Sequence, residues 1–196
     1  MNNDIINQIK EYATKNNVPI MNDSGISYLC DFIYQNNIKN VLEIGTAIGY
    51  SAIMMCLASS DVCVTSIERD EKRYLEAVKN VKKMNLEDRI NLIFKDALDI
   101  SINDKFDLIF IDAAKAQNIK FFEKFEYNLK SGGYIITDNL NFHGLVSMDV
   151  KDIKSRNLRQ LVRKINDYKR FLEKNSRYVT RFIDVGDGIS VSRKST

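Results

Sequence analysis

Short apolar runs alternate with amphipathic stretches through residues 41–137 of the chain. Several of the runs are almost continuously hydrophobic, which is typical of strands buried on both faces of a parallel sheet. We therefore expect five parallel strands, at residues 41–45, 62–67, 90–94, 106–111 and 134–137. The stretches between them have helical periodicity and predict helices over residues 50–58, 71–84 and 115–129. Strands that alternate with helices predict an α/β fold with a doubly wound sheet and right-handed crossovers.

The apolar periodicity also predicts which side of a helix faces the core. In the helix expected over residues 71–84, one face carries Tyr74, Leu75, Val78, Val81 and Lys82. These positions follow a spacing of 3.6 residues, so we expect this face to pack against the sheet.

Both ends of the chain depart from the alternation. Residues 5–13 and 24–33 can form two helices separated by Pro19, and we take residues 1–38 as an N-terminal helical cap region. Near the other end, a long helix with an apolar face precedes two strand-like runs at residues 178–184 and 189–193. This ending predicts an antiparallel hairpin that extends the mostly parallel sheet to seven strands. Because no repeat or linker interrupts the pattern, we expect residues 1–196 to form a single domain.

Composition narrows the class of protein. The chain has 196 residues, of which 44% are hydrophobic and 28% are charged, with only one Pro, and these values exclude collagen-like and disordered classes. No run approaches the ~18 apolar residues of a membrane span, and the first residues are too polar for a secretory signal. We therefore expect a cytoplasmic protein without a membrane partner. The three cysteines lack CxxC spacing, which disfavours a disulfide framework or a zinc ribbon.

Positive charge is concentrated in one segment. Residues 151–174 carry nine Lys or Arg and three acids, a net charge of +6 in a chain whose total is +3. A basic segment on an otherwise acidic body can bind a polyanion. On charge alone, a solvated helix face is the simpler interpretation.

Chemistry-bearing residues follow the first three predicted strands. The first strand runs into Glu43-Ile-Gly45-Thr-Ala-Ile-Gly49-Tyr-Ser51, where glycines allow a tight turn against a ligand. The Gly-x-x-x-Gly spacing is not that of a dinucleotide site, and the loop alone could be an ordinary turn of any α/β protein. Glu68 closes the second strand about 20 residues later, where an acid can bind ribose hydroxyls. Because Asp96 and Ala97 close the third strand, the set predicts an adenosyl ligand at this edge of the sheet.

Three oxygen-bearing side chains follow the next two strands. Asp112 ends the fourth strand, and Asp138 and Asn139 end the fifth. Two carboxylates and an amide suit a hard cation, and Mg²⁺ fits best. A single Asp or Asn at a strand end is usually a turn former. The only histidine, His143, has no partner at ligand spacing, which disfavours zinc.

Taken together, these motifs resemble the S-adenosylmethionine-dependent O-methyltransferases of the caffeoyl-CoA and catechol type. The resemblance covers nearly the whole chain, at residues 19–21, 41–51, 66–70, 106–115, 132–139, 142–146 and 185–189. It implies a Rossmann-like methyltransferase fold. It also implies a binding pocket for S-adenosylmethionine lined by Met21, Glu43, Gly45, Ser51, Glu68, Asp96, Ala97 and Asp112.

The resemblance also implies how the reaction proceeds. Asp112, Asp138 and Asn139 would hold Mg²⁺ or another hard divalent cation, and Lys115, beside Asp112, would be the catalytic base. A hydroxyl bound to the cation loses its proton more readily and then attacks the sulfonium methyl in line. As a base, Lys115 needs a lowered pKa, for which a nearby dication and the sulfonium charge supply a reason. If Lys115 points to solvent instead, the metal alone must activate the hydroxyl.

The sequence indicates the molecule that accepts the methyl group less clearly than it indicates the donor. Within the family, the chain resembles small bacterial members that methylate 5-hydroxyuridine at the tRNA wobble position to 5-methoxyuridine. The hydroxyl and the adjacent carbonyl of this base can both bind a metal, as a catechol does. We expect Arg156, Arg159 and Arg163 to contact phosphates of the tRNA, whose anticodon loop offers unpaired bases, and we expect a homodimer.

Other functions stay open. A small-molecule catechol or hydroxycinnamoyl-CoA O-methyltransferase would use the same residues on a different hydroxyl. A non-catalytic module that binds S-adenosylmethionine or RNA would not need the complete set of metal ligands and base. The glycine spacing disfavours a nicotinamide dehydrogenase.

Overall fold

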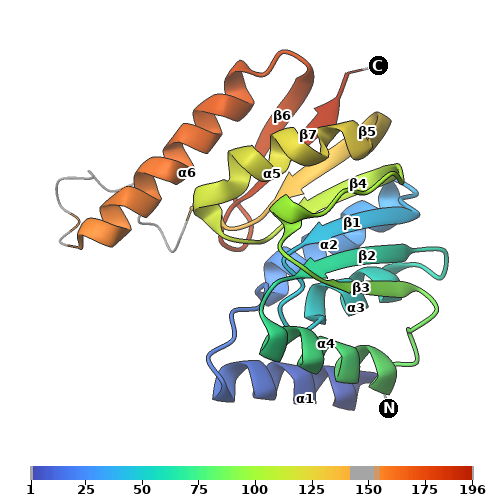
Figure 1. Cartoon of the computed structure of the whole chain (residues 1–196). Helices are drawn as coiled ribbons and strands as arrows, with labels where there is room; N and C mark the ends of the chain where they lie inside the picture. Colours follow the sequence, from blue (N-terminus) through green and yellow to red (C-terminus); the bar gives the residue numbers. More distant parts are fainter. Residues whose placement is uncertain (1, 142–152, 154, 196) are drawn as a thin grey trace.

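A mixed sheet of seven strands forms the centre of the molecule, in the order β3-β2-β1-β4-β5-β7-β6. The computed structural model describes residues 2–141, 153 and 155–195 (Figure 1). The strands are β1 (Asn40–Ile44), β2 (Cys63–Glu68), β3 (Ile90–Phe94), β4 (Phe106–Ile111), β5 (Leu129–Thr137), β6 (Tyr178–Ile183) and β7 (Ile189–Lys194). Strands β1 to β5 pair in parallel, whereas β7 is antiparallel to both of its neighbours. The predicted doubly wound sheet with a C-terminal antiparallel hairpin is confirmed.

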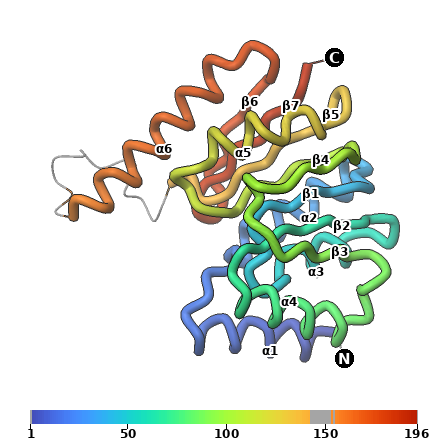
Figure 2. Tube along the Cα trace, viewed as in Figure 1, coloured from blue at the N-terminus to red at the C-terminus, as the bar shows by residue number. Residues whose placement is uncertain are grey.

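Helices cover both faces of this sheet. They are α1 (Asn2–Lys15), α2 (Asp23–Gln35), α3 (Tyr50–Ala58), α4 (Glu71–Lys83), α5 (Asn118–Phe125) and α6 (Arg156–Lys174), with short 3₁₀ turns η1 (Ala97–Asp99), η2 (Lys115–Gln117) and η3 (Glu126–Asn128). The first four pack on one face, and α5 and α6 pack on the other. Figure 2 shows that α1 lies near the β3 edge and the C-terminal hairpin at the opposite edge. None of the helices in the described part of the chain combines the length and the apolar character that crossing a membrane requires.

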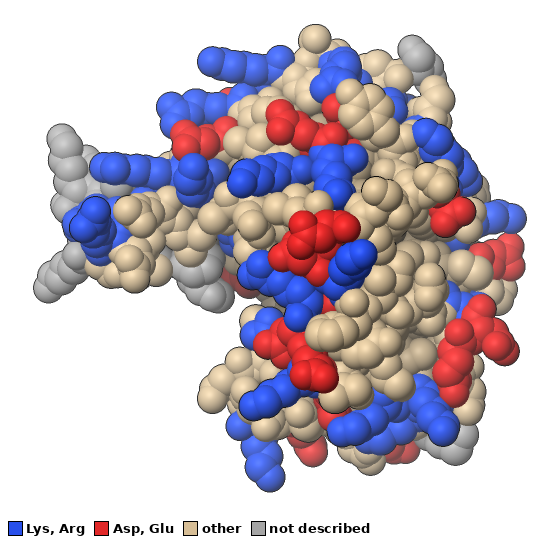
Figure 3. Space-filling view, in the orientation of Figure 1, with Lys and Arg blue, Asp and Glu red and all other residues tan. Residues whose placement is uncertain are grey.

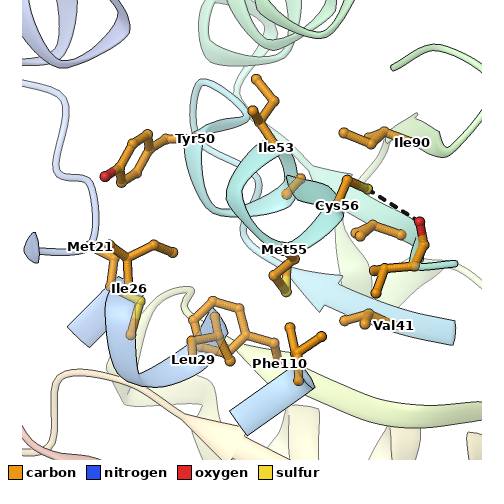
Figure 4. Packing of buried hydrophobic residues seen from close by; sticks show 14 of the residues in the cluster. Met21, Ile26, Leu29, Val41, Tyr50, Ile53, Met55, Cys56, Ile90 and Phe110 are labelled. Atoms are coloured by element: carbon orange, nitrogen blue, oxygen red, sulfur yellow. Dashed lines mark hydrogen bonds between the residues drawn. The ribbon is translucent and has the colours of Figure 1, made fainter. Parts of the chain in front are cut away.

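Strand side chains alternate between two hydrophobic clusters. In β1, Val41 packs toward α1 to α4, whereas Leu42 and Ile44 pack toward α5 and α6. Figure 4 shows part of the first cluster, in which Met55 of α3 points toward Leu29 and Phe110, whereas Ile53 projects from the opposite side of α3. Because both faces are covered, the central strands are apolar at nearly every position, and this explains the continuous runs in the sequence.

The segment expected to be one helix over residues 115–129 is divided. It forms η2, α5 and η3, and β5 then begins at Leu129 rather than at Tyr134. The extra part of β5 contains Gly132 at φ 69°, and its register with β4 shifts between Phe106 and Leu108. The polar and glycine-rich run that precedes Tyr134 hides this strand, because its propensity is poor and its pairing with β4 is nonlocal.

Helix α4 is rotated from the expected orientation. Leu75 and Val78 are 51% and 40% exposed, and the buried positions are Glu76, Ala77, Asn80 and Val81. The prediction of the apolar face was therefore wrong in part. Small and polar side chains set the docking here, since Ala77 packs on Gly49 and the Asn80 amide donates to the carbonyl of Ile48 at 2.9 Å.

Candidate active site

A cavity of about 360 Å³ opens at the carboxyl ends of strands β1 to β5. Nine of the residues predicted from sequence line it: Met21, Gly45, Glu68, Asp96, Ala97, Asp112, Lys115, Asp138 and Asn139. They come from separate segments of the chain, and the sheet topology brings their strand ends to one edge. The predicted donor and metal residues therefore share one cavity.

Gly45 provides the close approach in the loop after β1. Its φ is +99°, and a Cβ at this position would lie 2.3 Å from the carbonyl oxygen of Asp112. The amides of Gly45 and Thr46 both donate to the carbonyl of Ile67, at 3.0 and 3.2 Å. The loop therefore crosses between the ends of β2 and β4 in a conformation that only glycine adopts without strain.

At the end of β2, Glu68 is held by main-chain donors. Its carboxylate accepts from the amide of Ala47 at 2.8 Å, from that of Arg69 at 2.9 Å and from that of Asp70 at 2.8 Å. These bonds fix the carboxylate beside the Gly45 loop, on the wall of the cavity.

Asp96 occupies the equivalent place after β3. It accepts from the amide of Leu98 at 2.9 Å and from the Arg69 guanidinium at 3.1 Å. The bond from Leu98 is the main reason that the pKa of Asp96 lies below its usual range, and the pair with Arg69 adds to it. Asp96 is therefore an ionised acceptor beside the buried Ala97.

Glu43 and Ser51 do not line the cavity. Glu43 is fully buried, and its carboxyl accepts from the hydroxyls of Ser51 and Ser66. Its side chain points into the layer of α3 because strand side chains alternate and Leu42 and Ile44 point the other way. Burial raises the pKa of Glu43 to about 7. The two residues support the loop from behind, and direct contact with a cofactor stays a prediction.

Asp112 and Lys115 lie together at the other end of the cavity. The Lys115 Nζ donates to Asp112 Oδ1 at 2.8 Å and to the carbonyl of Asp138 at 3.4 Å. Lys115 thus points into the site rather than to solvent. It does so from η2, the short turn that follows β4.

Asp138 and Asn139 each have a polar atom without a partner among the described residues. Asp138 is only 3% exposed, and its Oδ1 and the Oδ1 of Asn139 are buried with no hydrogen-bond partner in that part of the chain. Burial, and then the charge of Asp112, raise the pKa of Asp138 to about 7. Asn139 adopts a left-handed φ of 70°, which turns the chain sharply after β5.

These oxygens fit a hard cation. Buried polar atoms normally have partners, and a carboxylate oxygen and an amide oxygen orphaned beside a second carboxylate are the donor types that Mg²⁺ prefers. The described residues contain no group of three His, Cys, Asp or Glu side chains arranged for a metal, so the amide of Asn139 is needed to complete a set of three. Lys115 already bonds Asp112 Oδ1, and a cation would have to displace or share that bond. His143 lies outside the described residues.

Sequence reasoning missed several lining residues. Gln117 and Phe121 follow Lys115, Arg73 projects from α4, and Asp187 lies in the turn before β7. Of these residues, only Asp187 was marked by a sequence motif that could have pointed to the site, because it belongs to Val185-Gly-Asp-Gly188. The others could not be placed without the packing of the helices.

The basic segment forms the exposed side of α6. Arg156 and Arg163 are exposed, whereas Arg159 is half-buried and donates to the carbonyl of Ile153 at 2.6 Å. The fully buried face of the helix begins only at Val162. In Figure 1 the first turns of α6 stand away from the sheet. Residues 151, 152 and 154 of the basic segment lie outside the described residues.

Known proteins resemble the chain in sequence and in structure. A family model described as O-methyltransferase matches residues 1–195. A caffeoyl-CoA O-methyltransferase from Populus kitakamiensis is 31% identical over 193 residues, which is 94% of this chain and 82% of the relative.

Two solved structures extend the comparison. A candidate caffeoyl-CoA O-methyltransferase from Staphylococcus aureus is 43% identical with a TM-score of 0.92, over 97% of this chain and 92% of that one. The O-methyltransferase from Bacillus cereus, solved with SAH, is 27% identical with a TM-score of 0.82, over 98% and 91% of the two chains. With a family model that spans nearly every residue and a fold shared throughout, the chain belongs to the O-methyltransferase family.

Proposed function

We propose that this chain transfers the methyl group of S-adenosylmethionine to a hydroxyl that is bound next to a divalent cation. One observation carries the proposal: a single cavity joins Glu68 and Asp96 at one end to Asp112, Lys115 and Asp138 at the other. The first end offers carboxylate acceptors for an adenosyl group, and the second offers cation ligands and a base. The related Bacillus cereus enzyme, solved with SAH, supports the same type of donor.

In this proposal the donor lies along the carboxyl ends of β1 to β3. Glu68 accepts hydrogen bonds from the ribose hydroxyls, and Asp96 and Ala97 contact the adenine. The methionine end crosses Gly45 between Met21 and Asp112. Because Gly45 has no side chain, this end can lie against the main chain of the loop.

Asp112, Asp138 and Asn139 would hold Mg²⁺ at the acceptor end. Bound there, the cation would lower the pKa of the acceptor hydroxyl, and the donor would supply the methyl group. Lys115 Nζ would be the chain's own proton acceptor in its neutral form, which requires that the ammonium group first lose a proton to solvent and release its hydrogen bond to Asp112 Oδ1. Lys115 lines the cavity beside Asp112 and Asp138, and this position supports the role.

For the acceptor, we propose 5-hydroxyuridine at the wobble position of tRNA. The observation that favours RNA is the basic side of α6, and Figure 3 shows Lys and Arg side chains over the part of the surface that α6 forms. Phosphate contacts dominate the affinity of proteins for nucleic acids. A homodimer would place a second basic surface on the same tRNA.

A small phenol is the second candidate. Several curated relatives are named for small acceptors, including the caffeoyl-CoA O-methyltransferase from Populus kitakamiensis. The same cation ligands and base would serve either acceptor, because both present a hydroxyl beside a second oxygen.

The test is methyl transfer from labelled S-adenosylmethionine to four acceptors. They are tRNA with 5-hydroxyuridine, the same tRNA with plain uridine, catechol and caffeoyl-CoA, each with Mg²⁺ and with excess chelator. We expect label only in the hydroxylated tRNA with Mg²⁺. Label in a phenol but not in tRNA would assign the small-molecule function, and full activity in chelator would contradict the role of the cation.

A further inference from the structure

The turn of residues 185–188, between β6 and β7, contacts segments at both ends of the cavity. It contains two glycines in the left-handed region, Gly186 at φ +61° and Gly188 at φ +84°. Its other side is fixed to the sheet, because Ser190 pairs with Thr137 of β5. The turn is therefore anchored next to the end of β5. Asp138, the first residue after this strand, belongs to the acceptor end of the cavity.

On the donor side the turn packs on Asn22. The Asn22 Oδ1 accepts from the amide of Gly25 at 2.9 Å and so caps α2, and its Nδ2 donates to Asp187 Oδ2 at 3.4 Å. A Cβ on Gly186 would lie only 2.8 Å from Asn22 Oδ1. The preceding residue, Met21, is buried and lines the cavity. A shift of the turn would therefore move the segment that closes the donor end.

On the acceptor side the turn packs on Asn141. The amide of Asn141 donates to the carbonyl of Asp187 at 2.7 Å, and the amide of Leu140 donates to the carbonyl of Gly188 at 2.8 Å. The Asn141 Nδ2 donates to Asp184 Oδ1 at 3.0 Å, and a Cβ on Gly188 would lie 2.6 Å from Asn141 Cγ. These contacts fix the two residues that directly follow the expected cation ligands Asp138 and Asn139.

We propose that Asn22 and Asn141 are positioning residues that couple the two ends of the site through the turn of residues 185–188. The inference rests on the proposed function, since the coupled ligands are the methyl donor and the cation. A turn held between two side-chain amides, without space for a Cβ on either side, transmits a displacement rather than absorbing it. Each ligand should then bind more tightly when the other has already fixed the turn, and the effect must be reciprocal.

The experiment measures this coupling by calorimetry with SAH and Mg²⁺. SAH carries no sulfonium charge, so direct repulsion between donor and cation is absent. The Kd for SAH is measured in chelator and in saturating Mg²⁺, and the Kd for Mg²⁺ with and without SAH. In the unaltered chain we expect each ligand to tighten the other by about 5-fold or more.

The variant Asn22→Ser isolates the contact with the turn. Serine still caps α2 through its hydroxyl but is too short to reach Asp187. The matched control is Asn36→Ser at the other end of α2, where the Asn36 side chain donates to the carbonyl of Phe32 at 2.9 Å and accepts from Tyr134 at 3.1 Å. We expect the coupling to fall to about 1-fold in Asn22→Ser and to keep its original value in Asn36→Ser. Asn141→Ala tests the acceptor side and should also lose the coupling.

Three results would overturn the inference. The first is binding of both ligands by the unaltered chain with no mutual effect. The second is a coupling that survives in Asn22→Ser, which would show that the shared residue Asp112 carries it alone. The third is an equal loss in Asn36→Ser, which would indicate a general loosening of α2. If the unaltered chain binds neither ligand, the proposed function itself fails, and this outcome is distinct from the other three.

Discussion

Glu43 is a carboxyl without access to water, held between two serine hydroxyls behind the Gly45 loop. Its pKa is raised from 4.5 to about 7, so the folded chain keeps this proton over a range in which the unfolded chain has lost it. The sign follows from linkage: the contribution to stability is complete below about pH 4 and is lost as the pH rises through 7. The size is roughly 3 kcal/mol in the free energy of unfolding.

The variant Glu43→Gln removes this titration. We expect its free energy of unfolding to change less between pH 4.5 and 7 than that of the original chain. Urea unfolding at several pH values measures the difference, with the exposed Glu71→Gln as control. Parallel pH profiles for the Glu43→Gln variant and the original chain would contradict a raised pKa at Glu43.

Glu68 differs from Glu43 because it lines the cavity and its carboxylate accepts hydrogen bonds from main-chain amides. Loss of a charged acceptor should cost about 1.5–3 kcal/mol of affinity for SAH in Glu68→Ala. Glu68→Gln keeps one acceptor oxygen, so this variant should lose less affinity for SAH than Glu68→Ala. Calorimetry that gives the original affinity for Glu68→Ala would mean that the ribose does not bind at the end of β2.

At the scale of the element, α6 tests whether the chain binds RNA. Arg156, Arg163 and Lys164 are exposed, whereas Arg159 supports the main chain at Ile153. Replacing the three exposed residues by Glu should weaken tRNA binding and flatten its dependence on salt, because fewer counterions are released. The pocket should keep its affinity for SAH.

The matched control reverses three exposed charges of α4, with Lys72, Lys82 and Lys83 replaced by Glu. It changes the net charge of the molecule by the same amount on another element. Equal salt slopes for the α6 variant and the original chain would make α6 an ordinary solvated helix. If both variants lost the same amount of tRNA affinity, the attraction between the chain and tRNA would be nonspecific.

Elements also show what could be predicted from the sequence. Buried strands and the residues at their ends were predictable, since apolar runs and polar strand ends are local signals. The orientation of α4 was not, because Ala77 and Asn80 dock the helix through contacts with the loop before α3. The place of Glu43 behind the cavity follows from strand alternation, and the resemblance hid this by grouping it with the donor residues.

At the scale of the whole molecule, ligands that bind only the folded chain must stabilise it. SAH at 100 times its Kd should add about 2.7 kcal/mol to the free energy of unfolding. Mg²⁺ should add a separate increment through Asp112, Asp138 and Asn139. Asp138→Ala should keep the effect of SAH and lose that of Mg²⁺, as followed by thermal unfolding.

The same variant has a second expected property. Asp138 Oδ1 is buried without a hydrogen-bond partner among the residues that the structure describes, so its removal should not destabilise the chain in chelator. A large loss of stability in chelator would mean that the carboxylate has a structural partner, and an intact response to Mg²⁺ would place the cation elsewhere.

The attachment of the C-terminal hairpin has a consequence for local unfolding. Strand β6 is outermost in the sheet and pairs only with β7, which in turn pairs with the rest of the sheet only through β5. An opening that separates β7 from β5 would leave β1 to β4 paired and would carry the turn of residues 185–188 away from Asn22 and Asn141. The amides of β7 should therefore exchange with solvent at a lower free energy than those of β1, and bound ligands should slow this exchange specifically. Proteolysis of the hairpin would then report whether the cavity is filled.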